Sequence, residues 1–229
     1  MSSSNTEPAG NVKAKCLPTY LLLDTSGSML PFADTLNKTL DHLYDTVVKS
    51  PRVSEFAHIS IISFNTSAHV VLPMMDIEQV TALPEVMCGG GTRYGDAFSL
   101  VHERIDVDVP ALNDAGRAVL RPAVFFLTDG NPTDEEGSWT EAYSRLVDPT
   151  WRRRPHVITY GFGAANSDIL GRIATKAAFL ADEQLDQQEA LAGVLSSMLQ
   201  SLVTSARADQ LLIPTDVPGF ISVPVEYTD

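Results

Sequence analysis

Short apolar runs recur along the chain, each bounded by polar, glycine or proline residues. The first run, 17–23, is largely apolar and ends at Asp24, which is typical of a strand buried on both faces of a parallel sheet. The runs 58–64 and 68–75 are separated only by three polar residues, which predicts a hairpin. Three further strands are predicted at 119–127, 156–160 and 177–180, the last of them at an edge of the sheet.

Segments with helical periodicity alternate with these strands. Apolar residues recur every three or four positions from Leu36 to Val47, so we expect a helix there, with Pro31 in its first turn. Ser138, with Glu141 three residues later, predicts a capped helix over 138–147. Further helices are predicted at 93–105, 166–174 and 187–204, the second of them N-capped by Asn166.

The order of these elements predicts an α/β fold: a doubly wound, mostly parallel sheet that carries one antiparallel edge strand and is flanked by helices. We expect a disordered leader over 1–15, one domain over 16–206 and a proline-containing tail over 207–229. The prolines of the tail argue against a helix there. Three outcomes are open for the tail: it packs back on the domain, docks on a partner, or has no fixed place.

Composition narrows the class of protein. Hydrophobic residues make up 44% of the 229 positions, which is enough for one packed domain. The formal net charge of -13 repels phosphate backbones, so nucleic acid is not an expected partner. The chain shows neither a secretory signal at its start nor an apolar run of the ~20 residues that a membrane helix needs. Two cysteines, Cys16 and Cys88, suit a reducing compartment, so we expect a cytoplasmic protein; a disulfide between them stays open.

Three oxygen-rich clusters are placed next to predicted strands or helices. Asp24 to Ser28 follow the first strand, Thr128-Asp129-Gly130 follow the strand that ends at 127, and the glycine-rich cluster Gly89-Gly90-Gly91-Thr92 precedes a helix. Loops at the carboxyl ends of parallel strands converge on one crevice, where ligands bind. Three such loops together indicate a site for a hard cation.

These clusters resemble a known metal site. Asp-x-Ser-x-Ser, a distant Thr and a later Thr-Asp-Gly, in this order, look like the metal-ion-dependent adhesion site (MIDAS) of von Willebrand factor A (VWA) domains, whose fold is Rossmann-like. The matching residues are Asp24, Ser26, Ser28, Thr92 and Asp129. The resemblance implies that Ser26 and Ser28 ligate the metal through their hydroxyls and that Thr92 joins them in the ligand-binding state. It implies that Asp24 and Asp129 act mainly through metal-bound waters and hydrogen bonds.

The resemblance implies Mg²⁺ as the ion, with Mn²⁺ or Ca²⁺ as alternatives. Neutral hydroxyl ligands leave most of the charge of Mg²⁺ unquenched, so an open coordination position would attract an Asp or Glu carboxylate of a partner protein. We therefore expect a non-enzymatic, metal-dependent protein-binding module or scaffold. The segments LLLDTSGSM, GGGTRYGDAF and FFLTDGNPTD also look like the bacterial TerY-like branch, associated with tellurium resistance and stress response. That resemblance implies phosphorylation signalling, with kinase- or phosphatase-like partners.

A metal-assisted phosphohydrolase that uses the same acidic crevice is the alternative function. No convincing general base or nucleophile stands near the predicted ion, and Ser26 occupies the position where a haloacid-dehalogenase phosphatase has its second Asp. The five histidines are scattered, with no pair at metal-ligand spacing. Arg93, Tyr94 and the acidic segment 134–136 are expected at the rim of the site, where partner identity would be decided.

Two features are not explained by the metal site. Arg152, Arg153 and Arg154 form the only dense basic segment of an acidic chain. They either engage an acidic or phosphorylated partner or form a solvated connection between a helix and a strand. Cys88 borders the glycine-rich loop and is either redox-sensitive or simply a small buried residue.

Overall fold

The computed structural model of the protein describes residues 13–75, 80 and 82–227, so most of the predicted leader lies outside the described residues. An eight-stranded sheet runs through the molecule in the order β3-β2-β1-β5-β6-β7-β8, and β4 pairs with β1 beside it. The strands are β1 (Lys15–Asp24), β2 (Ala57–Phe64), β3 (Ala68–Met75), β4 (Ala118–Val119), β5 (Ala123–Thr128), β6 (His156–Gly161), β7 (Ala177–Ala181) and β8 (Phe220–Val223).

The predicted fold class is confirmed: the sheet is mixed, mostly parallel and flanked by helices. The hairpin strand β3 lies antiparallel to β2 at one edge, as predicted. At the other edge β8, from the tail, lies antiparallel to β7, so 177–180 is not the edge strand that we expected. Of the three outcomes open for the tail, Phe220–Val223 takes the first and packs back on the sheet.

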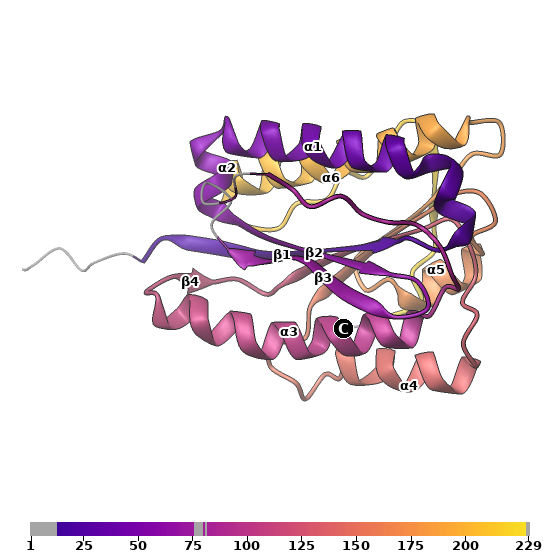
Figure 1. The fold of residues 1–229 in the computed structure, drawn as a ribbon. Helices are drawn as coiled ribbons and strands as arrows, with labels where there is room; N and C mark the ends of the chain where they lie inside the picture. The colour runs from indigo at the N-terminus through magenta and orange to yellow at the C-terminus, as the bar shows by residue number, and fades with distance from the viewer. Residues whose placement is uncertain (1–12, 76–79, 81, 228–229) are drawn as a thin grey trace, which may run out of the picture.

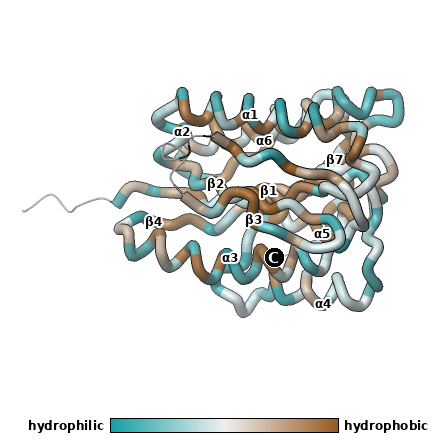
Figure 2. The backbone as a smooth tube through the Cα atoms, viewed as in Figure 1, coloured by the Kyte–Doolittle hydropathy of each residue, from teal (hydrophilic) through white to brown (hydrophobic). Residues whose placement is uncertain are grey.

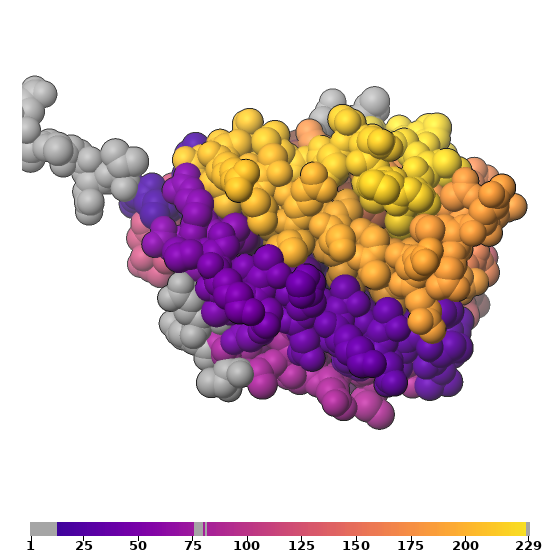
Figure 3. Space-filling model, turned by 90° about the horizontal axis from the view of Figure 1, so that it is seen from above, coloured from indigo at the N-terminus to yellow at the C-terminus, as the bar shows by residue number. Residues whose placement is uncertain are grey.

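Helices cover both faces of the sheet (Figure 1). On one face lie α1, α2 and α6; seen from above, α1 and α6 lie side by side over the sheet (Figure 3). On the other face lie α3, α4 and α5. The helices are the 3-10 helix η1 (Gly27–Phe32) and the α-helices α1 (Ala33–Val48), α2 (Pro51–Phe56), α3 (Tyr94–Asp114), α4 (Glu136–Leu146), α5 (Ser167–Ile173) and α6 (Gln187–Ala208).

Strand β1 has apolar residues on both faces because it lies inside this sandwich. Leu21 and Leu23 pack into the core beneath α1 and α6, whereas Tyr20 and Leu22 pack into the core above α3 and α4. The hydropathy of the chain follows this arrangement, with hydrophobic strands at the centre and hydrophilic stretches on the outer helices (Figure 2). Within the described ranges, none of the helices combines the length and the apolarity that a membrane crossing requires.

Several predicted boundaries are wrong. The run 119–127 is two strands, because the chain leaves β4 at Leu120 and enters β5 only after Pro122, which has no N–H to donate. Helix α4 begins at Glu136 with Glu135 as its N-cap, so Ser138, predicted as the cap, already lies inside the helix. Pro31 lies in η1 rather than in the first turn of α1.

Helix α3 continues nine residues beyond its predicted end at 105. The continuation contains Asp108, a charged residue on the buried face that breaks the apolar periodicity in the sequence. The structure compensates for its burial, because Asp108 accepts a hydrogen bond from the Tyr20 hydroxyl at 3.1 Å and pairs with Arg104. A buried acid with partners of this kind is compatible with a helix, and its partners are not visible in a hydropathy pattern.

Candidate metal centre

Asp24 is the last residue of β1, at the carboxyl edge of the parallel strands, and its side chain is fully buried. Its Oδ1 atom accepts a hydrogen bond from the Ser26 backbone N–H at 2.8 Å. Its Oδ2 atom accepts one from the Thr128 hydroxyl at 2.6 Å. Both carboxylate oxygens are thus fixed by neutral donors, one from the following loop and one from the end of the neighbouring strand β5.

Ser26, Ser28 and Asp129 form a continuous chain of oxygens beside Asp24. The Ser26 and Ser28 hydroxyl oxygens lie 3.0 Å apart. The Ser28 hydroxyl donates to Asp129 Oδ1 at 2.8 Å, which joins the loop after β1 to the loop after β5. Four of the five residues predicted for the metal site are therefore brought together.

Thr92 lies on the glycine-rich loop, which is docked against the β1 loop by backbone hydrogen bonds. The Gly27 N–H donates to the Gly90 carbonyl at 3.0 Å, and the Gly89 N–H donates to the Thr25 carbonyl at 2.7 Å. Thr92 itself is buried, and its backbone N–H donates to the Thr133 hydroxyl at 2.9 Å. Among the described side chains, the Thr92 hydroxyl forms no hydrogen bond with the other four predicted residues.

Gly90 is required by the way this loop packs. Its φ of +80° lies in the left-handed region, and a Cβ atom there would come within 2.4 Å of the Thr66 hydroxyl oxygen. That same hydroxyl accepts a hydrogen bond from the Gly91 N–H at 2.9 Å, so the β2–β3 turn supports the loop that carries Thr92.

Within the described part of the chain, the two carboxylates of the centre have no positively charged partner. Neither Asp24 nor Asp129 forms an ion pair with the described Lys, Arg and His side chains. Burial raises the pKa of Asp24 to about 6; hydrogen bonds from Thr128 and Ser26 oppose this rise, and the charge of Asp129 adds to it. Burial also raises the pKa of Asp129, against the hydrogen bond from Ser28. Two buried acids of this kind are a favourable place for a cation.

The spacing of the oxygens fits a small divalent ion. In an octahedral Mg²⁺ site with metal–oxygen distances of about 2.0–2.1 Å, neighbouring ligands lie about 3 Å apart. The 3.0 Å between the Ser26 and Ser28 hydroxyl oxygens, the two that are expected to ligate the metal directly, is close to this value. The described ranges contain no group of three or more His, Cys, Asp or Glu side chains that could hold a metal, and this centre has only two carboxylates, so its other oxygen donors are hydroxyls.

Two residues expected at the rim have structural roles instead. The Asp134 carboxylate accepts hydrogen bonds from the Tyr94 and Gly95 N–H groups, so it caps the start of α3. Tyr94 is buried, and its hydroxyl donates to the Gly130 carbonyl at 2.8 Å. Arg93 is half-exposed and pairs with Asp96 at 3.4 Å.

Thr128 and Thr133 support the centre and were not predicted to do so. The only sequence signal for Thr128 is its place beside Asp129 at the end of a strand, and Thr133 has none. Both cysteines are free thiols, so the disulfide that the sequence left open is not formed. Burial, together with the charges of Asp24 and Asp129, raises the pKa of Cys88 to about 11.

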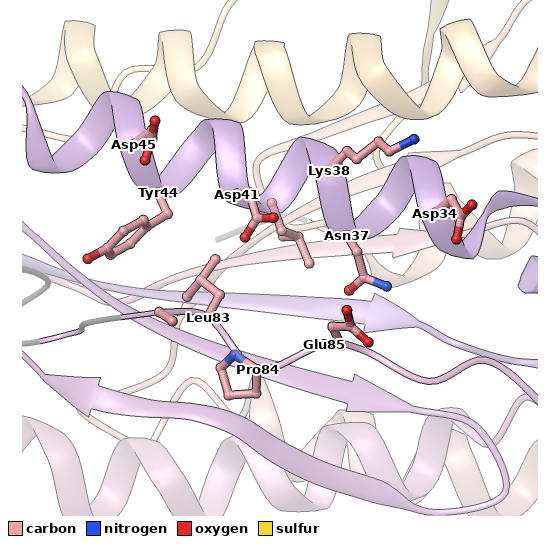
Figure 4. Close-up of a pocket in the computed structure, with 11 residues that line it drawn as sticks. Asp34, Asn37, Lys38, Asp41, Tyr44, Asp45, Leu83, Pro84 and Glu85 are labelled. Atoms are coloured by element: carbon pink, nitrogen blue, oxygen red, sulfur yellow. The ribbon is translucent and has the colours of Figure 1, made fainter.

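A surface cavity of about 590 Å³ lies apart from this centre, between α1 and the segment 82–85 (Figure 4). Asn37 holds the two walls together, because its side chain donates to the Val86 carbonyl at 3.1 Å and accepts from the Val86 N–H at 2.8 Å. The lining contains three acids of α1 and Glu85 but none of the five predicted metal-site residues. The cavity is thus separate from the centre formed by the strand ends.

Comparisons with known proteins agree with this fold. The family model described as "von Willebrand factor type A domain" matches residues 20–193. A solved von Willebrand factor type A structure from Catenulispora acidiphila superposes with a TM-score of 0.57 at 17% identity, over 82% of this chain and 43% of that one. The ArnB paralog VWA2 from Sulfolobus acidocaldarius has a TM-score of 0.55 at 17% identity, over 82% of this chain and 46% of that one.

A third similar structure is proximal thread matrix protein 1 from the mussel byssus with a zinc-occupied MIDAS motif. Its TM-score is 0.57 at 16% identity, over 83% of this chain and 48% of that one. The chain thus spans less than half the length of each of these three solved chains. A comparison with curated protein sequences finds no match. Because the family model covers most of its length, the chain belongs to the von Willebrand factor type A domain family.

Proposed function

We propose that this VWA domain is a non-enzymatic binding module in which a divalent ion, Mg²⁺ by preference, bridges the domain to a carboxylate of a partner protein. The five residues that would hold the ion are Asp24, Ser26, Ser28, Thr92 and Asp129. The observation that carries the proposal is the pair of buried carboxylates, Asp24 and Asp129, which lie beside two serine hydroxyls and form no ion pair with the described side chains.

The chemistry of these groups favours docking. Serine hydroxyls bring no charge to the ion, so the ion keeps its attraction for an external acidic oxygen. VWA domains in general mediate protein–protein interactions, and the mussel byssus protein carries zinc in its MIDAS motif. The zinc in that related site supports a metal ion in the same part of the present domain. The choice of Mg²⁺ as the ion is based on the donor atoms, which are all oxygens.

Hydrolysis by the same crevice is the competing function, and Cys88 is a thiol whose pKa is affected by the charges of Asp24 and Asp129. Its pKa, raised to about 11, keeps the thiol protonated at neutral pH, which argues against nucleophilic catalysis. Turnover of generic phosphoesters with Mg²⁺ that disappears in Asp24→Ala would overturn the binding function.

The narrower assignments remain predictions. Membership of the TerY-like branch, with roles in tellurium resistance or stress response and with kinase- or phosphatase-like partners, rests on three sequence segments alone. The cytoplasmic location likewise rests on the sequence. The family finding supports the VWA domain without specifying any of these.

Isothermal titration of the full chain with MgCl₂ tests the metal site. We expect one saturable binding event in the wild type and none in the double variant Ser26→Ala/Ser28→Ala. The matched control is Ser138→Ala/Ser144→Ala, which removes two exposed hydroxyls from α4 and is expected to bind Mg²⁺ normally. A pull-down from a cell extract with Mg²⁺ and with EDTA then tests docking. Capture that does not depend on the metal would contradict the proposed bridge.

A further inference from the structure

A cavity of about 290 Å³ lies at the end of the sheet opposite to the metal centre. Its walls come from the last turns of α3, from the connection between β4 and β5, and from the segment 152–154 that leads into β6. These are the amino ends of β5 and β6, near the label of β4 in Figure 1. Strand β5 has six residues, so about 20 Å separates this cavity from the carboxyl edge where Asp129 follows β5.

The charge of this cavity is opposite to that of the molecule. The chain carries 16 basic residues against 29 acidic ones, yet four arginines line this one cavity and no described Asp or Glu does. The four are Arg121, Arg152, Arg153 and Arg154. The cavity beneath α1, by contrast, is lined by four acids and one lysine. A single anionic group would find a local positive site here, whereas a long polyanion would still meet the repulsion of the whole surface.

The segment that carries the arginines is held in place rather than free in solvent. Asp106 on α3 forms an ion pair with Arg153 Nη1 at 2.9 Å, which balances one of the four positive charges, and accepts a hydrogen bond from the Trp151 indole N–H at 3.3 Å. The Trp151 ring stacks on His102 with centroids 4.1 Å apart. The backbone N–H of Arg154 donates to the Trp151 carbonyl at 3.0 Å, which closes a turn that contains Arg152 and Arg153. A fixed backbone lowers the entropy lost when these side chains bind a ligand.

Backbone carbonyls orient two of the guanidinium groups. Arg121 donates to the carbonyls of Arg154 and Pro155 at 3.0 and 3.2 Å, and Arg154 donates to the Pro149 carbonyl at 3.0 Å. Arg152 is exposed and forms no hydrogen bond or ion pair with the part of the chain that the structure describes. A charged side chain with no partner among the described residues, in the lining of a cavity that contains three further arginines, is suited to bind a ligand.

We propose that this cavity binds the phosphoryl group of a phosphate monoester. Guanidinium groups bind phosphate oxygens through paired N–H donors, and several of them match the dianion that a monoester becomes near pH 7. Apolar residues complete the lining, among them Val109, Val119 and Leu120, and they suit the carbon stem of an ester. At 290 Å³ the cavity lies at the lower limit of small-molecule sites, so it takes one phosphoryl group and a short stem.

The experiment is isothermal titration of the full chain in EDTA at pH 7.5 with inorganic phosphate, with phenyl phosphate and with a phosphoserine peptide. We expect saturable binding, tighter for phenyl phosphate than for inorganic phosphate. Arg152→Ala should weaken it about tenfold or more, as the loss of a charged hydrogen bond does. Arg152→Lys keeps the charge but loses the paired N–H donors of the guanidinium group, so its affinity for phosphate should lie between those of the wild type and Arg152→Ala.

Two controls separate this site from general charge and from the metal centre. Arg145→Ala removes an exposed arginine of α4 and changes the net charge equally, so it should bind phosphate normally. Ser26→Ala/Ser28→Ala should also bind normally, because the two sites share no residue. A phosphoserine peptide that binds more tightly than phenyl phosphate identifies a protein-borne phosphoryl group; the reverse identifies a small ester. Absence of saturable binding, or equal weakening in Arg145→Ala, would overturn the proposal.

Discussion

Replacing Asp24 by Asn should make the metal-free protein more stable. Burial raises the pKa of this carboxyl from 3.8 to about 6, so above pH 6 its charge costs the folded state about 3 kcal/mol relative to the unfolded one. Asparagine removes that charge and keeps the hydrogen bonds. Its oxygen can accept from the Ser26 N–H, while the Thr128 hydroxyl can accept from its amide and donate to the Gly130 carbonyl, 3.1 Å away.

The sign of the pH dependence follows from the raised pKa. The folded state holds the Asp24 proton more tightly than the unfolded state, so the cost is present above pH 6 and is relieved as the pH falls toward 4. Asp24→Asn should therefore exceed the wild type by about 1–3 kcal/mol at pH 7.5 in EDTA, and the difference should shrink at pH 5. Addition of Mg²⁺ at a thousandfold excess over its dissociation constant should reverse the order, because only the wild type keeps the full site and gains about 4.1 kcal/mol from binding.

Urea unfolding measures these differences, with the fluorescence of Trp139 and Trp151 as the signal. Each protein is unfolded at pH 7.5 and pH 5, with EDTA and with Mg²⁺. The control is Asp114→Asn, which removes an exposed carboxylate at the end of α3 and should show no such reversal. Should Asp24→Asn prove less stable than the wild type in EDTA at pH 7.5, the reasoning from burial would be refuted.

Three further predictions concern the metal, the loop and the thiols. Mg²⁺ at a hundredfold excess over its dissociation constant should stabilise the fold by about 2.7 kcal/mol and raise the Tm by about 5–10 °C. Thermal melts that coincide with EDTA and with Mg²⁺ would count against a metal site. Gly90→Ala should lower the free energy of unfolding by about 1 kcal/mol or more in urea, because the φ of residue 90 is positive and the new Cβ atom would clash with the Thr66 hydroxyl. The same variant should bind Mg²⁺ more weakly in titration. The control is Gly137→Ala, where a Cβ atom on α4 meets no neighbouring atom. Burial raises the pKa of both Cys16 and Cys88 to about 11. In the folded protein at pH 7.5, both thiols should therefore react with a thiol reagent far more slowly than in the protein unfolded by urea. Equal rates in the folded and unfolded protein would contradict their burial.

Most of the strands and the order of the metal-site residues could be predicted, because local sequence determines them. A strand buried on both faces, such as β1, is apolar along most of its length. A polar residue where such a strand ends therefore lies at the carboxyl ends of the parallel strands, where ligands bind. Asp24 and Asp129 could be placed by this rule alone. Their mutual proximity then follows from the parallel pairing of β1 with β5.

The supporting residues could not be predicted, because their partners are distant in sequence. Thr128 acts through Asp24, 104 positions earlier, and Thr133 acts through the backbone of Thr92, 41 positions earlier. Strand β8 was missed for the same reason: four residues in a proline-containing segment pair with β7, and two of the four are exposed. Neither periodicity nor composition carries the signal of such pairings.

Strand β8 also determines where the chain can be shortened. The family match ends at residue 193, and a chain cut there would lose both most of α6 and the strand that covers β7. The backbone N–H and carbonyl groups of β7 that pair with β8, in a strand that contains the buried Phe179, would then be open to solvent. An uncovered apolar edge pairs readily with the edge of another molecule, so the short tail strand protects this domain against self-association.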